Sequence, residues 1–240
     1  MISGKILFPT HGNPYRSMFK YEHILTQPLF FLFVAFSFLL TLGYFWGRRQ
    51  NREIFLSAFN DLMAVFRPDD QTFTNIGGAI GYHANLFIRK KGAFLSRVDA
   101  TITMLPRHSW LYLPVSKLIR KYDRLFIELY VKNKPEEECH IIEKRYARFA
   151  GARIAGAERL NRETVAWGAH TFHLYYETIG MHTRLMDFID RNPEPGIIRH
   201  IAIVPNQKKC FIFMIPRKGQ VAKYLSPVYQ WLPSLFKKAD

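Results

Sequence analysis

Few residues of this sequence that could perform catalysis or bind a metal have the spacing that a catalytic or metal site requires. His170 and His173 form an HxxH pair, but the segment around them alternates like a strand, where a separation of three places two side chains on opposite faces. Cys139 precedes His140, and no third group close in the sequence would orient the pair. The phosphate-loop, GxSxG, HExxH and CxxC patterns do not occur. The sequence therefore predicts no catalytic residue, no metal site and no cofactor.

His108, Asp123 and Asp99 keep an enzymatic alternative open. A histidine and two carboxylates supply the groups that general acid–base catalysis needs. They would serve a membrane-bound enzyme that acts on a lipid or a lipid-linked substrate at the interface. Because no motif connects the three residues, a non-enzymatic protein is the preferred interpretation.

Basic residues carry more information than these candidates. The chain has 34 Lys and Arg residues against 19 Asp and Glu residues, so its formal net charge is +15. Two basic groups with interleaved aromatic residues consist of Lys117, Arg120, Lys121 and Arg124, and of Arg145 and Arg148. Such mixtures suit RNA phosphates with exposed bases, and they equally suit anionic lipid headgroups. A solvated face is the simpler alternative for each group alone. We expect these residues to bind RNA or another anionic surface.

The segment 24–47 contains no charged residue and is apolar over most of its length. A helix rises about 1.5 Å per residue, so this segment is long enough to cross the roughly 30 Å hydrocarbon core of a bilayer. The expected membrane-anchor residues are Phe30, Phe33, Phe36, Leu39 and Trp46. The juxtamembrane bases Arg48, Arg49 and Arg52 follow at once. The sequence therefore predicts a single transmembrane helix with an interfacial end after Trp46.

The distribution of basic residues around this segment predicts its orientation. Arg48, Arg49, Arg52 and Arg67 follow the span, whereas Lys5, Arg16 and Lys20 precede it. Because cytosolic flanks carry more Lys and Arg, we expect residues 1–23 to be a short extracytosolic tail and residues 48–240 to be a cytosolic domain. The membrane would be the endoplasmic reticulum in a eukaryote and the plasma membrane in a prokaryote. Cys139 and Cys210 agree with a reducing compartment, although one disulfide between them stays open.

Residues 48–240 mix helical and strand periodicity. Helical spacing occurs in 51–66, 115–122, 183–191 and 221–236, and Pro227 and Pro233 must kink or split the last helix. Alternating apolar residues predict strands in 78–89, 93–105, 124–131, 167–176, 197–204 and 210–215. The polar stretch 136–163 favours a helix. This order predicts an α+β domain with helices on one face of a mostly antiparallel sheet.

Three stretches of the chain carry a resemblance to a known family. They are GRRQNREI at 47–54, MHTRLMDFIDRNPEPGIIRHIAIVP at 181–205 and CFIFMIPRKGQVAKYLSPVYQWLPSLFKK at 210–238. Together with the order of a single span and an α+β domain, they resemble the calumin-like family. These are coiled-coil-domain-containing membrane proteins of the endoplasmic reticulum that belong to the translocon-associated PAT complex. The similarity extends over residues 30–238.

The resemblance implies a non-catalytic accessory factor that assists the insertion or folding of multipass membrane proteins. Its partners would be the bilayer, ribosomal RNA, the protein-conducting channel and client membrane proteins, with no small-molecule substrate. The sequence lacks the long acidic luminal segment and the C-terminal coiled coil of the eukaryotic members, so it resembles a minimal version. Ribosome binding would then fall on the basic groups of the domain. A structural tether that contacts no RNA is a third hypothesis.

Overall fold

The longest element of the molecule is helix α2 (Pro28–Phe66), which runs without a break from the predicted span into the predicted helix at 51–66. The structure, a computed structural model, describes residues 27–150 and 154–236. The predicted tail at 1–23 and the start of the span at 24–26 lie outside the described residues. Pro28 occupies the first turn of α2, where a missing N–H group costs little. One rigid element therefore carries both the apolar segment and part of the domain core.

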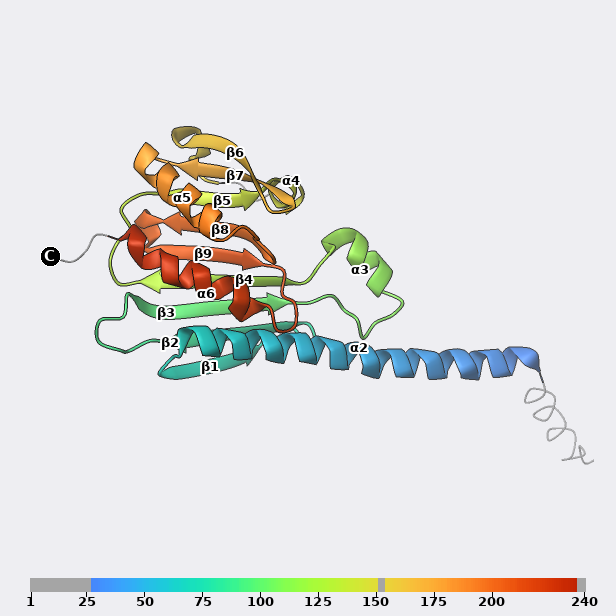
Figure 1. Cartoon of the computed structure of the whole chain (residues 1–240). Coiled ribbons are helices and arrows are strands. Elements are labelled where there is room, and N and C mark those ends of the chain that lie inside the picture. The colour runs from blue at the N-terminus through green and yellow to red at the C-terminus, as the bar shows by residue number, and fades with distance from the viewer. Residues whose placement is uncertain (1–26, 151–153, 237–240) are drawn as a thin grey trace, which may run out of the picture.

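A single antiparallel sheet forms the body of the domain (Figure 1), with the strand order β1-β2-β3-β4-β9-β8-β5-β7-β6. The strands are β1 (Asp70–Asn75), β2 (Gly81–Phe87), β3 (Leu95–Thr103), β4 (Arg124–Val131), β5 (Cys139–Glu143), β6 (Asn161–Trp167), β7 (His170–Tyr176), β8 (Ile198–Val204) and β9 (Lys209–Met214). The hairpins β2–β3 and β8–β9 confirm the predicted strand pairs at 78–105 and 197–215.

Shorter helices connect the strands or cover them. They are α3 (Leu113–Arg120), α4 (Lys144–Ala150), α5 (Ile179–Arg191) and α6 (Val221–Trp231), with 3₁₀ turns η1 (Ala157–Arg159), η2 (Pro205–Gln207) and η3 (Leu232–Leu235). Pro227 lies inside α6, and Pro233 stands where α6 gives way to η3. The predicted split of the last helix is therefore confirmed.

One face of the sheet packs against the second half of α2 and against α5 and α6 (Figure 1). Leu62 of α2, Leu185 of α5 and Leu225 of α6 are fully buried in the same core as Ile127 and Ile212 of the central strands. Alternate residues of each strand reach this core because successive side chains point to opposite faces. The predicted α+β class is confirmed.

The opposite face carries a smaller cluster of aromatic and histidine side chains. Tyr146 of α4 stacks on Phe213 with ring centroids 4.4 Å apart. His140 and His200 stack beside them with centroids 5.7 Å apart. Burial, together with the smaller effect of the neighbouring His140, lowers the pKa of His200 to about 3. Burial also lowers the pKa of His140, so both rings are neutral at pH 7.

Antiparallel pairing gives the sheet two ends with different connections. Gly81 pairs with Thr103 and Thr103 pairs with Arg124, so the β1–β2 turn and the β3–β4 connection lie at the same end. The start of β8 and the ends of β5 and β9 lie there too, because Ile142 pairs with His200 and their strands alternate in direction. We call this the proximal end, since the first half of α2 projects beyond it (Figure 1). The distal end carries the turns at 88–94, 132–138 and 205–208.

The prediction of a helix over 136–163 is wrong. Residues Cys139–Glu143 form β5, which lies between β7 and β8 and is buried along its whole length. Helix follows only at Lys144–Ala150, and strand β6 begins at Asn161. A short strand buried on both faces has no alternation to reveal it, and its polar flanks favour helix. Strand β1 was not predicted either, because its residues are exposed throughout.

The two cysteines lie in the core as free thiols. Cys139 pairs with Ile203, and Ile203 pairs with Cys210, so strand β8 separates the thiols. Two strand spacings place their Cα atoms about 10 Å apart, beyond the reach of a disulfide. Burial raises the pKa of Cys210 to about 12 and raises that of Cys139 as well. The disulfide that the sequence left open is therefore excluded, and both thiols are unreactive.

Candidate functional site

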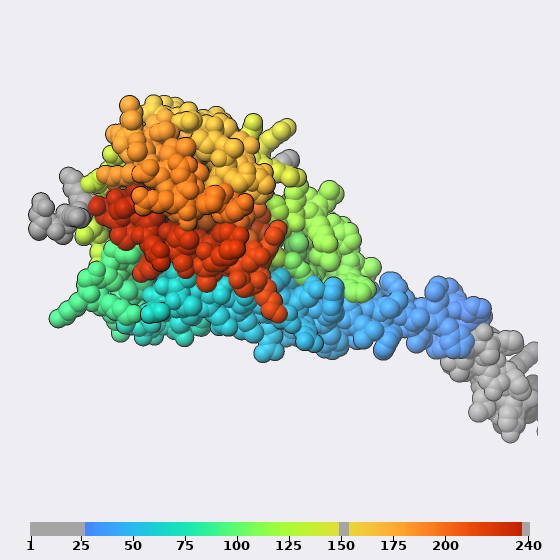
Figure 2. Space-filling model, viewed as in Figure 1, coloured from blue at the N-terminus to red at the C-terminus, as the bar shows by residue number. Residues whose placement is uncertain are grey.

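The first half of α2 lies outside the domain and exposes its apolar side chains (Figure 2). Leu29 is 71% exposed, Phe33 is 68% exposed and Leu39 is 53% exposed. Within residues 27–150 and 154–236, α2 is the one helix long and apolar enough to cross a membrane. The predicted anchor residues Phe30, Phe33, Phe36, Leu39 and Trp46 all lie on this half. The candidate site begins where this segment meets the domain.

Two glycines of α2 form the contact between the apolar segment and the domain. Gly43 and Gly47 are buried, although most of their neighbours on the helix are exposed. A Cβ atom on Gly43 would collide with the indole of Trp110, and one on Gly47 would collide with the backbone of Arg107. The β3–β4 connection therefore lies directly on the helix. A GxxxG spacing of the kind that serves helix pairing in membrane proteins is occupied here by the chain's own loop.

A buried polar network fixes this connection to α2. The Asn51 amide donates to the carbonyl oxygens of Leu105 at 2.9 Å and Ala79 at 3.1 Å. Arg107 donates to the Asn51 side-chain oxygen at 2.9 Å and to both carboxylate oxygens of Asp123 at 2.9 and 2.7 Å. Asp123 also accepts the Leu105 N–H at 2.8 Å. Charge-assisted bonds of this kind hold both ends of the connection in place.

The juxtamembrane bases line a groove beside this network. Arg48, Arg49 and Arg52 border a cavity of about 800 Å³ together with Tyr44 and His108. The ring of His108 packs edge-on against Tyr44, with centroids 5.8 Å apart. Arg48 donates to the Tyr44 hydroxyl at 3.3 Å, and Arg49 pairs with Glu53 at 3.2 Å. The groove is thus lined by basic and aromatic side chains, and it lies next to the end of the apolar segment.

The second predicted basic group lies on α3 and at the start of β4. Lys117 and Arg120 are exposed on α3, which the β3–β4 connection carries at the proximal end. Lys121 follows in the left-handed region, with φ of 63°, and Arg124 begins β4. Arg124 shares the strand face of Phe126, so it points toward the aromatic cluster beneath α4.

The third basic group lies on α4. Arg145 and Arg148 border a groove of about 480 Å³ with Lys144, Glu143 and His170. Glu143 is neutralised by other residues, since its carboxylate lies 3.2 Å from Arg199 Nε and 3.0 Å from His170 Nδ1. The groove therefore retains a positive charge.

The fold brings all three basic groups to the proximal end of the sheet. The groups stand far apart in the sequence, but α2 passes this end, the β3–β4 connection closes it and α4 begins there (Figure 1). Basic groups in one place attract anionic partners more strongly than single residues do. The proximal end is therefore the candidate functional site.

The three acid–base candidates do not form a site with one another. Asp123 is held by Arg107, and His108 packs on Tyr44. Asp99 pairs with Arg97 on the open face of the sheet, four positions from Thr103, which corresponds to about 13 Å along β3. No group of three or more His, Cys, Asp and Glu side chains that could hold a metal ion occurs in the part of the chain that the structure describes.

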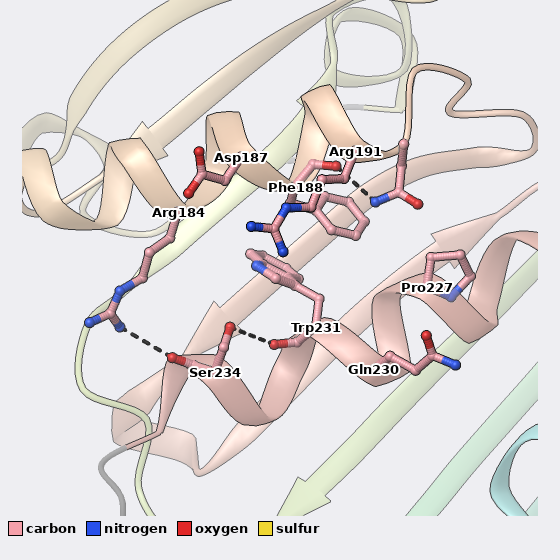
Figure 3. Close-up of a pocket in the computed structure, with 9 residues that line it drawn as sticks. Arg184, Asp187, Phe188, Arg191, Pro227, Gln230, Trp231 and Ser234 are labelled. Carbon is pink, nitrogen blue, oxygen red and sulfur yellow. Dashed lines mark hydrogen bonds between the residues drawn. The ribbon is translucent and has the colours of Figure 1, made fainter.

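A groove of different character lies between α5 and α6 (Figure 3). It has a volume of about 550 Å³ and contains Phe188 and Trp231, which stack with centroids 4.5 Å apart. Arg184 donates to the carbonyl oxygen of Ser234 at 3.4 Å across it. Asp187 lies on the same rim, so acidic and basic side chains alternate. This groove lacks the single sign of charge that marks the proximal end.

Comparison with known proteins assigns no family to the chain. No protein-family model matches the sequence, and no curated protein matches it either. The functional argument therefore depends on the geometry of the proximal end.

Sequence reasoning missed the residues that position this site. Asn51 and Arg107 were not among the predicted site residues, because their partners lie 16 to 56 positions away in the sequence. Gly43 and Gly47 did leave a signal, since they are the two small residues among bulky ones at the end of the apolar segment. Glycines four residues apart on a helix indicate close approach of another backbone.

Proposed function

We propose that the protein is a membrane-anchored, non-enzymatic accessory factor that assists the insertion or folding of multipass membrane proteins. One observation carries this proposal: the exposed apolar half of α2 continues into the core of the domain, so the anchor and the basic proximal end form one rigid unit. An anchored domain of this kind presents its bases next to the membrane surface, where headgroups and ribosomal RNA are the abundant anions.

A binding role is supported over catalysis by what the candidate catalytic groups do. The Asp123 carboxylate accepts bonds from Arg107 and Leu105 and serves the network that holds the β3–β4 connection. Asp99 lies on another part of the sheet. The alternative, an enzyme acting on a lipid at the interface, would need these groups to converge on one substrate.

The role in membrane-protein biogenesis is supported by the resemblance to the calumin-like family and by the composition of the anchor. Phe33, Phe36 and Leu39 offer bulky lipid-facing surface, and Gly43 and Gly47 are already covered by Trp110 and Arg107. Small residues are what tight helix dimers use, so this anchor suits lipid or large client helices better than self-pairing.

Sedimentation of solubilised native membranes tests the role directly. The full-length protein should travel with ribosomes and the protein-conducting channel after mild crosslinking. The double variant Arg145→Glu/Arg148→Glu should lose that association, whereas the distal variant Lys90→Glu/Lys91→Glu should retain it. Migration that stays independent of ribosomes and channel under crosslinking would contradict the proposal.

The proposed side of the membrane has its own test. With the domain in the cytosol, protease added outside sealed cells or organelles should leave the chain beyond Arg49 intact and digest it only after the membrane is opened. Digestion in sealed membranes would place the domain on the opposite side from ribosomes.

A further inference from the structure

Helix α3 exposes its apolar face instead of burying it. Leu118 is 80% exposed, Ile119 is 69% exposed and Leu111, just before the helix, is 70% exposed. Val115 extends the same stripe, because positions 115, 118 and 119 lie on one side of the helix. The buried residue of α3 is Ser116. A surface helix of a soluble domain turns its apolar stripe to the core, so this helix has the reverse orientation.

The position of α3 is fixed relative to the membrane anchor. Trp110, which precedes the helix, packs against Gly43 and lies edge-on to Trp46, with ring centroids 6.5 Å apart. Gly47 contacts the backbone of Arg107. At about 1.5 Å per residue, a span that starts at Pro28 reaches roughly 30 Å near Gly47. The connection that carries α3 therefore meets α2 where the hydrocarbon core would end.

The charges around α3 fit a lipid surface. Residues 107–122 contain no acid, and Lys117 and Arg120 occupy the side of the helix away from the apolar stripe. Figure 2 shows the α3 segment bulging from the domain beside the projecting part of α2. Helices that lie in a membrane interface combine an apolar face with lysine and arginine on the other face.

We propose that α3 and Trp110–Tyr112 insert into the leaflet from which α2 emerges and form a second contact with the bilayer, with Lys117 and Arg120 on anionic headgroups. This inference rests on the proposed membrane anchoring. Lipid is the occupant favoured over a second copy of the chain, because the apolar stripe is continuous with the anchor through Trp110 and Trp46. Two contacts fix the tilt of the domain, which a single helix would leave free.

Site-specific fluorescence in reconstituted vesicles tests the insertion. The full-length chain carries one introduced cysteine labelled with an environment-sensitive NBD dye, in vesicles of phosphatidylcholine with phosphatidylglycerol. Cys139 and Cys210 are buried, so the introduced thiol takes the label. Leu118→Cys probes α3, and Ile179→Cys is its matched control, since both side chains are 80% exposed but Ile179 begins α5 at the distal end. Phe36→Cys reports on the anchor.

The expected result is blue-shifted emission at Leu118→Cys and several-fold stronger quenching by spin-labelled lipid than at Ile179→Cys. Equal quenching at these two positions, with strong quenching at Phe36→Cys, would overturn the insertion of α3 and leave the anchor in place. A blue shift that disappears when the protein is diluted in lipid, and an emission that spin-labelled lipid does not quench, would overturn the insertion of α3. Such a result would mean that a second copy of the chain covers the apolar stripe. Unquenched Phe36→Cys would overturn both the insertion and the proposed function.

Discussion

The two ends of the sheet differ in charge. Around the proximal end the exposed charged residues are mostly basic, and they include Arg48, Arg49, Arg52, Lys117, Arg120, Lys144, Arg145 and Arg148. Around the distal end acids accompany the bases, with Asp69, Asp70, Glu136, Glu137, Glu138 and Glu177 beside Arg89, Lys90, Lys91, Lys132, Lys134 and Lys208. Strand pairing does not require this difference in charge between the two ends. The difference separates an end suited to an anionic surface from an end suited to water.

The ends also differ in how their connections are held. The proximal β3–β4 connection is tied to α2 by the buried Asn51–Arg107–Asp123 network. At the distal end the pair Arg89–Asp70 is largely exposed to solvent. Removal of one partner from a buried ion pair lowers the stability of the fold strongly, because it leaves an uncompensated buried charge. An exposed ion pair contributes little to that stability. The molecule is therefore expected to tolerate change at the distal end and to resist it at the proximal end.

The largest effect is expected from Asp123→Ala. This change leaves the guanidinium of Arg107 without its carboxylate in a mostly buried place and should lower the free energy of unfolding by about 3–5 kcal/mol. Denaturant unfolding of the full chain in detergent micelles measures it. The distal counterpart Asp70→Ala should cost less than about 0.5 kcal/mol. Similar losses for the two variants would break the comparison between the ends.

A pair of identical substitutions tests the close contact on α2. Gly47→Ala places a methyl group against the backbone of Arg107 and should destabilise the protein by about 1–3 kcal/mol. Gly180→Ala, in the first turn of α5, meets only the Thr178 hydroxyl at 3.6 Å and should stabilise it by about 0.4–1 kcal/mol. Thermal unfolding measures both changes. The same sign for both would argue against a packed connection at Gly47.

Acid should destabilise the side of the sheet that α4 covers. His200 has a pKa of about 3 in the folded state, lowered first by burial and then by His140, against about 6.5 when unfolded. The unfolded chain therefore binds more protons between these values, so stability falls as the pH decreases from 6.5 toward 3, by up to about 1.4 kcal/mol per pH unit. His200→Phe should flatten this slope in unfolding titrations. An unchanged slope would mean that His200 is not the responsible group.

Among the changes at the proximal end, the smallest effect per residue is expected from surface charge on α3. Lys117→Glu/Arg120→Glu should weaken the attachment of α3 to anionic vesicles by about 1 kcal/mol per residue, and added salt should reduce the difference. The emission of NBD at Leu118→Cys, compared between neutral and anionic vesicles, reports it. The distal Lys90→Glu/Lys91→Glu pair serves as control and should leave the emission unchanged. An equal change of emission for both pairs of substitutions would mean that the net charge of the protein, and not the position of these bases on α3, governs the attachment.

Much of this fold could be predicted from the sequence because most elements have clear periodicity. The apolar segment, the helix at 51–66, the short helix near 117 and the hairpins β2–β3 and β8–β9 follow from spacing alone. Strand β5 could not be predicted, because a five-residue strand buried on both faces has no alternation. This segment becomes a strand by pairing with β7 and β8, which come later in the chain.

The candidate site was predictable in its parts but not in its assembly. The basic groups at Arg48, Lys117 and Arg145 are visible in the sequence, but their gathering at one end depends on strand direction across the whole sheet. The reversed orientation of α3 was hidden for a different reason. Its apolar stripe reads like that of any amphipathic helix until the structure shows that Leu118 points away from the core.

The central claim is that the proximal end faces the bilayer, and energy transfer from the domain to the membrane surface tests it most directly. Donor dyes at Lys117→Cys and at Lys91→Cys, in the full chain reconstituted in nanodiscs with acceptor-labelled headgroups, report the height of each end. The eight residues of β4 span about 25 Å, so the donor at position 117 should lie closer to the headgroups by about that distance. Equal heights, or a shorter distance from position 91, would contradict the account.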